Sequence, residues 1–451
     1  MVKQDVCAFN YLRICIFVLA LLSGPTCVYA GAYAMSAHGD PGAGVLRSSM
    51  PDAYSRGNCA HCHEQHASVG GVQPSPTDTA ASGFALFSPN FSGKAVSPYT
   101  REDNFCFQCH TVFSSLQVGG VLINHDYAET FGGYDDGTNE GILEQFNHTS
   151  GAENSYHNLL DIQRYAAQNF TWFGDDTNPC VACHNPHRAR RNKSAVDNPA
   201  LTAISRPTDH ENIWGAASGE TMARYNDYLS PYFYNSTTRY EPGGKTFSAP
   251  NLVPDYSTFC NDCHAVTMPP IYSTELGRNL VMIDWSSAEG GDKHGQSART
   301  GETWLREPYA SGNKSNYVLS CLDCHEPHGS PYPFLVRRSI NGEPLHLTST
   351  VNDGRGNQCR QCHQDDSQLG TGAVNDWKLQ HHGQGDQSPY SSGSKESGCV
   401  CHYPEGSGGG EGRPPAIRCE ICHYHGSFVP NPAGEWPATV PLKKGGTRKT
   451  F

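Results

Sequence analysis

Sixteen of the cysteines in this chain form eight close pairs, and a histidine directly follows each pair. The other three of the 19 cysteines, Cys7, Cys15 and Cys27, lie near the start of the chain. Seven pairs read Cys-x-x-Cys-His, and the pair at Cys399 is one residue shorter. The eight pairs are Cys59/Cys62, Cys106/Cys109, Cys180/Cys183, Cys260/Cys263, Cys321/Cys324, Cys359/Cys362, Cys399/Cys401 and Cys419/Cys422.

This spacing predicts covalently attached haem. Two thiols on one helical turn can add to the two vinyl groups of a haem, and the next histidine then lies under the iron. Disulfides would leave the histidines unexplained, and zinc sites do not require histidine directly after the second cysteine. We expect eight haems c, although a strained or absent thioether, or a local disulfide, stays open at Cys399. The predicted proximal ligands are His63, His110, His184, His264, His325, His363, His402 and His423.

The remaining histidines divide the chain into four units. In the first three, a lone histidine, outside any motif, lies 21 to 27 residues before the first cysteine of a doubled motif, which has a second histidine three residues after the first, as in "CHEPH". A plain motif, which is Cys-x-x-Cys-His without the second histidine, follows. The last unit is looser, because the short Cys399 motif precedes "CEICHYH". Each unit then holds two haems and two spare histidines, which predicts two imidazoles on every iron. The predicted second ligands are His38, His66, His157, His187, His294, His328, His382 and His425.

The doubled motif itself suggests how haems are placed. Histidines three positions apart project from one side of a helical turn. The first can bind its own haem while the second reaches the iron of a neighbouring haem; hydrogen bonding to propionates is the alternative for the second. We keep His125, His148 and His210 as reserve ligands, and we expect solvated or structural roles for His61, His346 and His381.

The rest of the sequence predicts little regular structure. Charged residues are 17% of the chain, against about 25% in typical globular proteins, and no long segment of the mature chain keeps a helical or strand period. The predicted fold is mostly coil, with short helices at the haem-binding motifs and few strands, wrapped around a continuous haem chain that supplies the apolar core. Residues 1–30 resemble an export signal, with cleavage after Ala30 or Ala34. The expected haem units are 31–150, 151–285, 286–370 and 371–451.

Motifs such as "CVACHNPH" and "CLDCHEPH", with plain motifs between them, resemble those of doubled-motif multihaem c-type cytochromes. More specifically, they are similar to the outer-surface cytochromes of metal-reducing, Geobacter-like bacteria, some of which polymerise into extracellular haem filaments. The resemblance implies other c-type cytochromes and extracellular electron acceptors as partners. It also implies a homopolymer in which His66 ligates a haem of the neighbouring subunit. This chain differs from that group in haem number and in the short Cys399 motif.

Electron transfer is the function that these features predict. Two imidazoles leave an iron no open position for a substrate. The alternative is an octahaem reductase or oxidase of a small nitrogen or sulfur compound with one five-coordinate haem, but the Cys-x-x-Cys-Lys motif of such enzymes is absent. A structural or adhesive haem protein is a third class. We expect a secreted, cell-surface protein, or a periplasmic one, with no membrane span after signal removal. The net charge of −12 argues against nucleic-acid binding.

Overall fold

The structure is a computed structural model, and it describes the residues that carry six of the eight motifs. The described residues are 31–42, 44–50, 54–64, 84–118, 141–147, 155–189, 216, 232–235, 239–242, 256–285, 294, 305–306, 319–337, 339–340, 343–345, 358–364, 367–368, 370, 423–424 and 427–428.

The helices of the described residues are short. The longest, α5, begins after Asn158, whose side chain accepts a hydrogen bond from the backbone N–H of Asp161 and so caps the first turn. The α-helices are α2 (Gly31–Ala34), α4 (Ile142–Phe146), α5 (Leu159–Asn169) and α7 (Tyr256–His264). The 3-10 turns are η1 (Cys59–His61), η2 (Arg101–Asp103), η3 (Phe105–Gln108), η4 (Pro179–Ala182), η9 (Cys321–Asp323) and η10 (Pro333–Leu335).

The described strands form two-stranded antiparallel pairs. β1 and β6 join distant parts of the chain, since Ser155 pairs with Ser330. The pairs are β1 (Ser155–Tyr156) with β6 (Gly329–Ser330), β2 (Tyr232–Asn235) with β3 (Arg239–Pro242), β4 (Tyr272–Ser273) with β5 (Arg278–Asn279), β7 (Ser339–Ile340) with β8 (Glu343–Pro344), and β9 (His423–Tyr424) with β10 (Ser427–Phe428). The predicted fold class, mostly coil with short helices and few strands, is confirmed.

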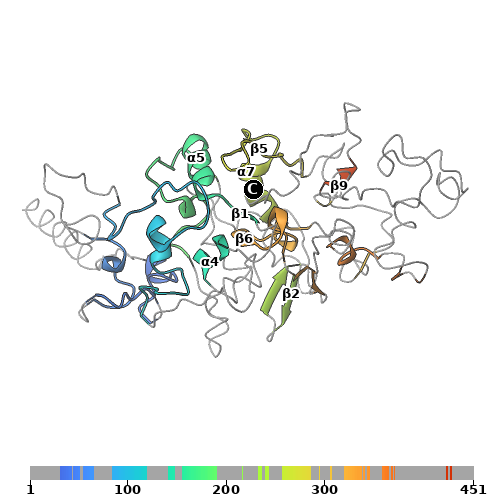
Figure 1. The fold of residues 1–451 in the computed structure, drawn as a ribbon. Helices are drawn as coiled ribbons and strands as arrows, with labels where there is room; N and C mark the ends of the chain where they lie inside the picture. The colour runs from blue at the N-terminus through green and yellow to red at the C-terminus, as the bar shows by residue number, and fades with distance from the viewer. Residues whose placement is uncertain are drawn as a thin grey trace, which may run out of the picture.

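Apolar packing in the described residues is divided among small clusters. One, rich in aromatic rings, consists of Tyr99, Phe107, Leu143, Phe146, Tyr156 and Leu159. A second consists of Tyr165, Ala166, Phe170, Phe173, Ala182 and Ile271. A third consists of Val336, Ile340 and Leu345. The first two clusters both include residues of α5, and the labelled elements run from α4 and α5 past α7 and β6 to β9 (Figure 1).

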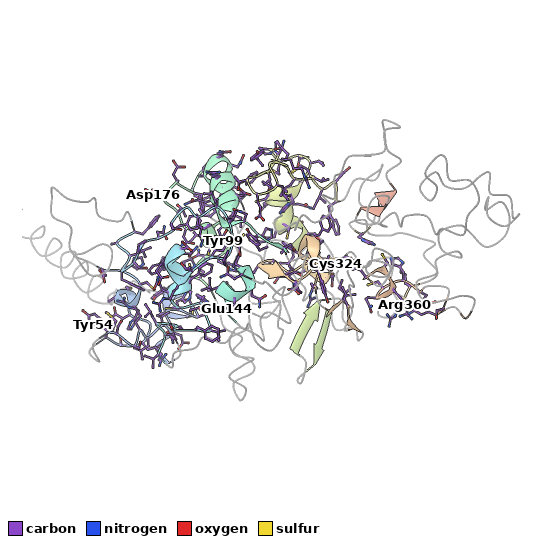
Figure 2. The ribbon with its side chains drawn as sticks, in the orientation of Figure 1. Tyr54, Tyr99, Glu144, Asp176, Cys324 and Arg360 are labelled. Carbon is purple, nitrogen blue, oxygen red and sulfur yellow. The ribbon has the colours of Figure 1, made fainter. Side chains whose placement is uncertain are left out.

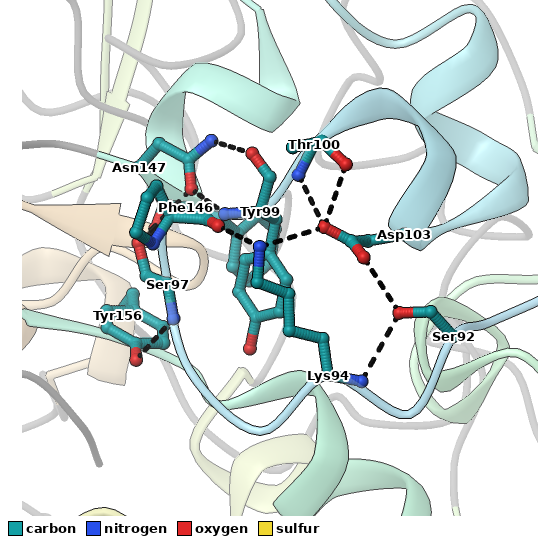
Figure 3. Close-up of polar contacts among 10 residues, drawn as sticks. Ser92, Lys94, Ser97, Tyr99, Thr100, Asp103, Phe146, Asn147 and Tyr156 are labelled. Atoms are coloured by element: carbon teal, nitrogen blue, oxygen red, sulfur yellow. Dashed lines mark hydrogen bonds and ion pairs between the residues drawn. The ribbon is translucent and has the colours of Figure 1, made fainter.

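A polar network fixes the loop that precedes the Cys106 motif. Asp103 accepts hydrogen bonds from the backbone N–H and the hydroxyl of Thr100 and from the hydroxyl of Ser92, and its carboxylate lies 3.1 Å from the Lys94 ammonium. On the other side, the Asn147 amide exchanges hydrogen bonds with the backbone of Tyr99 (Figure 3). The network joins the two ends of residues 92–103 and fixes Tyr99 between them, shortly before the η3 turn.

The described residues contain no helix that is both long enough and apolar enough to span a bilayer.

Candidate haem-binding sites

Four of the six described haem-binding motifs share one local design. A polar residue before the first cysteine caps the turn, and its side chain accepts a hydrogen bond from the N–H two positions later, as Asn58 does from Ala60. Asn104, Asn178 and Ser320 cap the turns of the Cys106, Cys180 and Cys321 motifs in the same way. This capping satisfies a donor that would be unpaired at the start of the turn.

Each turn presents two sulfurs and one imidazole together. The backbone N–H of the histidine donates to the backbone carbonyl of the first cysteine. Examples are His63 to Cys59 at 2.8 Å and His184 to Cys180 at 2.8 Å. The twelve described cysteines, from Cys59 to Cys362, are all free thiols. No disulfide joins two of these described cysteines.

The structure brings the predicted ligands together as opposed imidazole pairs. A metal–imidazole bond is about 2 Å long, and roughly 1 Å more separates the nitrogen from the ring centre, so two imidazoles on opposite faces of one iron have centroids roughly 6 Å apart. Five pairs have this separation: His38/His110 at 6.0 Å, His63/His187 at 6.2 Å, His157/His264 at 6.1 Å, His184/His328 at 6.0 Å and His294/His363 at 6.2 Å.

The planes of the paired rings differ between sites. They lie at 82° for His38/His110 but at only 17° for His63/His187. The other three pairs have angles of 24°, 32° and 43°. The His38/His110 site is therefore the one described site with nearly perpendicular imidazoles.

Backbone carbonyls set the tautomer of several of these histidines. The Nδ1 atoms of His38, His63 and His325 lie 2.7, 2.8 and 2.7 Å from the carbonyl oxygens of Pro186, Phe84 and Phe334, and Nδ1 of His157 bonds to the carbonyl of Pro327. When Nδ1 donates its proton, Nε2 keeps a lone pair for a metal.

Burial also favours the neutral, ligating form of the imidazole. It lowers the pKa of His110 to about 3, with the neighbouring His38 and His184 adding to the effect. The pKa of His184 falls to about 4 and that of His328 to about 3, again mainly through burial. These donor sets fit a haem iron with one imidazole on each face.

The pairing follows a regular register. The second histidine of a doubled motif lies opposite the proximal histidine of the preceding doubled motif, as His187 does for His63 and His328 for His184. The lone histidine of a unit instead lies opposite the plain-motif histidine of that unit. These second pairs are His38 with His110, His157 with His264 and His294 with His363.

Sulfur atoms of successive motifs also lie near one another, in chain order. Between units, the Cys180 side chain lies close enough to Cys106 to raise its pKa, and Cys321 raises the pKa of Cys260 in the same way. Within units, electrostatic repulsion between thiolates adds to burial in raising cysteine pKa values. The within-unit neighbours are Cys62 and Cys109, Cys183 and Cys263, and Cys324 and Cys362. In Figure 2, Tyr54 and Asp176 lie toward one end of the described part of the molecule, and Cys324 and Arg360 lie toward the other.

Sequence reasoning missed a loop that serves the proximal histidine of two doubled motifs. After His63, the loop places the carbonyl oxygen of Phe84 at Nδ1 of His63. The carbonyl oxygen of Ala85, a residue with φ 48°, accepts a hydrogen bond from the backbone N–H of Glu64. After His325, Phe334 and Leu335, at φ 51°, make the same two contacts. The only signal in the sequence is the similarity of "FAL" and "FLV" downstream of the two motifs.

The other histidines are partly described. His61 is 1% exposed and bonded to the backbones of Arg47 and Ser55, so of its two predicted roles it has the structural one. For His423, only the backbone in β9 is described. Other predicted positions lie outside the described residues: His66, His382, His402, His425, Cys399, Cys401, Cys419 and Cys422, with the reserve or structural candidates His125, His148, His210, His346 and His381.

Among the described side chains, no group of three or more His, Cys, Asp or Glu could hold a bare metal ion. A family model described as the doubled CXXCH motif matches residues 314–368, a small part of the chain that includes the Cys321 and Cys359 motifs. The match indicates a multihaem c-type cytochrome that carries covalently bound haem c and transfers electrons. No curated protein and no solved structure matches the chain.

Proposed function

We propose that the chain binds eight haems c, each ligated by two histidines, and conducts electrons along them outside the cell. The five opposed imidazole pairs, each with centroids 6.0 to 6.2 Å apart, carry this proposal. Neutral imidazole on both faces of an iron excludes exogenous ligands and favours one-electron transfer over substrate chemistry.

The order of the sulfur contacts supports a single path. Thioethers attach to one edge of each porphyrin, so neighbouring cysteines of different motifs bring porphyrin edges together. Electrostatic interactions connect second cysteines within a unit and first cysteines between units, and these interactions link the six described motifs in sequence order. An electron entering at one end could then pass every haem in turn.

The number of haems can be tested directly. We expect intact-mass measurement of the exported protein to give the polypeptide without residues 1–30 or 1–34 plus eight haems, and alkaline pyridine spectra to give the same ratio. A C399A/C401A double variant should carry seven. Eight haems in that variant, or fewer than eight in the wild type, would contradict the proposal.

The register of the pairs also supports a homopolymer. By this register we expect His425 to serve the His325 haem, because at two described sites the second histidine of a doubled motif lies opposite the proximal histidine of the doubled motif before it. By the same rule His66 serves a haem ahead of Cys59, where the sequence has no further motif. We propose that the Cys419 site of a second copy supplies that haem, so that the haem path continues from one subunit to the next.

An H66A variant tests this assembly. We expect wild-type protein to form filaments in electron micrographs and H66A to remain as single subunits with a full complement of haems. An H346A variant, which removes a histidine outside the predicted ligand set, should assemble as the wild type does. Filaments of normal length from H66A would rule out ligation between subunits and leave the electron-transfer role standing.

A further inference from the structure

Arg47 is a buried cation beside the first haem-binding turn. It is 7% exposed, and its guanidinium carbon lies 3.7 Å from the centre of the Phe87 ring. One Nη atom lies 2.9 Å from the Met50 sulfur and 3.4 Å from the carbonyl of Ala60, which lies between the two cysteines of that turn. The Nε atom is buried and has no hydrogen-bond partner.

The same residue links the first and second motifs. Its backbone N–H donates to Nδ1 of His61 in the first turn at 3.3 Å, and the residue forms a β-bridge with Gln117. The neighbour of Gln117, Leu116, donates to the carbonyl of Gln108 in the second turn at 2.9 Å. Arg47 thus lies between the turns of the first two motifs.

The charge of Arg47 reaches a sulfur of each motif. Burial raises the pKa of the Cys62 thiol to about 12 and that of Cys109 to about 11, and the positive charge of Arg47 opposes both rises. Arginine stays protonated even when buried. Charge in a low-dielectric interior acts strongly over such distances.

A guanidinium occupies the equivalent place in the third unit but comes from another part of the chain. Arg337 donates to the carbonyl of Leu322, which follows the first cysteine of its turn as Ala60 does, at 3.1 Å. Its N–H bonds to the Cys324 carbonyl, as that of Phe87 does to the Cys62 carbonyl. Arg337 therefore takes the chain position of Phe87, on whose ring Arg47 lies. The guanidinium groups of Arg47 and Arg337 therefore lie at similar places beside their turns, although the two residues come from different positions relative to the motifs.

The two guanidinium groups differ in compensation. Nε of Arg337 lies 3.7 Å from a carboxylate oxygen of Glu326, and both side chains are 2% exposed. Arg47 forms no ion pair with any residue that the structure describes; the Glu64 carboxylate only adds a longer-range attraction. The buried positive charge of Arg47 in the first unit is therefore not neutralised by an ion pair among the described residues, whereas that of Arg337 in the third unit is neutralised by Glu326.

We infer that Arg47 is a tuning residue that raises the reduction potential of the two haems attached at Cys59/Cys62 and Cys106/Cys109. The inference rests on the proposed haem attachment at these motifs. One electron converts Fe(III) to Fe(II) and removes a unit of positive charge, so a nearby cation favours the reduced state. No proton moves at Arg47 in this step. Electrons then favour the first unit of each subunit.

Among the five described imidazole pairs, only His38/His110 is nearly perpendicular, so its iron can be distinguished from the other four. Ferric haems with nearly perpendicular imidazoles give a highly anisotropic low-spin EPR signal, while nearly parallel imidazoles give a rhombic one. An EPR-monitored redox titration can follow the anisotropic signal alone. We expect R47Q to lower its midpoint by the equivalent of about a tenfold change in the oxidised-to-reduced ratio, and R47K, which keeps the charge, to leave it near the wild-type value.

Two further variants separate charge from structure. M50E places a carboxylate beside the guanidinium, as Glu326 lies beside Arg337, and should lower the same midpoint while Arg47 is kept; M50Q should not. R278Q removes an exposed arginine and should change nothing. The inference is wrong if R47Q and M50E leave the midpoint unchanged, or if R47K lowers it as much as R47Q does. Haem content equal to wild type in each variant keeps this outcome separate from a failure of the proposed function.

Discussion

The side-chain amides of Asn104 and Asn178 hydrogen-bond to each other in both directions, at 2.9 and 3.3 Å, although the residues are 74 positions apart. Each also caps the turn of its own haem-binding motif. Their amides contact the opposite cysteines, with Asn104 Nδ2 3.7 Å from the Cys180 sulfur and Asn178 Oδ1 3.8 Å from the Cys106 sulfur. One pair of amides therefore fixes the junction between the first two units.

Removing one of these amides should destabilise the protein. N178A removes a cap and leaves the Asn104 amide buried without its partner, since the two residues are 4% and 0% exposed. We expect a loss of about 1–3 kcal/mol in the free energy of unfolding. Denaturant titration followed by circular dichroism measures it, with N279A as a control at an exposed asparagine. Equal midpoints for the two variants would contradict the role of the amide pair.

Adding a methyl group next to a ligand should displace that ligand. A Cβ at Gly329 would lie 1.9 Å from the backbone oxygen of Gln145, so β6 and the adjacent His328 must move. We expect G329A to lose stability by more than about 1 kcal/mol and to weaken low-spin ligation at the His184/His328 site. EPR spectra of the oxidised protein report the ligation.

Gly174 offers a control for that experiment. A Cβ there would meet only the Thr177 hydroxyl, at 3.8 Å, so G174A should keep the wild-type spectrum. A wild-type spectrum and stability in G329A would show that the close backbone approach does not position His328.

The sequence predicted the chemistry of the motifs better than their spatial partners. Cys-x-x-Cys-His is a local pattern, because one helical turn sets the positions of the sulfurs and the imidazole. The fold class followed from the same motifs and the low apolar periodicity. Contacts such as Asn104 to Asn178 could not be predicted, because asparagine before a turn reads only as a cap.

The distal ligands show the same division. The counts of histidines predicted two imidazoles for each iron, and the doubled motif predicted ligation of a neighbouring haem. Which haem each histidine faces depends on how distant loops pack, so the pairing of His187 with His63, over more than one hundred residues, came from the structure. The carbonyls of Phe84 and Phe334 likewise have no recognisable motif of their own.

Loss of one distal ligand should open one identifiable iron. H38A removes an imidazole from the nearly perpendicular site, so we expect the highly anisotropic EPR signal to disappear, a high-spin signal to replace it, and the reduced protein to bind carbon monoxide. H187A removes a ligand from the most nearly parallel pair and should retain the anisotropic signal. Loss of that signal in H187A and its survival in H38A would overturn the assignment.

Acid stability should depend on Asp103. Burial alone would raise the pKa of this carboxyl, but hydrogen bonds from Thr100, Ser92 and Lys94 outweigh it and hold the pKa below its ordinary value of 3.8. The unfolded chain therefore binds the proton first as the pH falls. The stabilisation is complete above about pH 3.8 and is lost as the pH falls through the lower, folded pKa.

The size of this contribution is modest, about 1 kcal/mol, because Lys94 and Asp103 are partly exposed. We expect the free energy of unfolding of D103N to be lower at neutral pH and to fall less steeply below pH 3.8. Denaturant titrations at several acidic pH values measure the slope. If the free energy of unfolding fell more steeply with decreasing pH in D103N than in the wild type, the proposed role of Asp103 would be contradicted.

The spin state of the complete, oxidised protein tests the central claim most directly. Near-infrared magnetic circular dichroism distinguishes bis-imidazole iron from iron with any other ligand set, and it counts both. If the protein conducts electrons through haems with histidine on both faces, the spectrum contains only the low-spin bis-imidazole band, with an intensity that corresponds to all of the haems. A high-spin band from even one haem per subunit would contradict this account and favour the reductase.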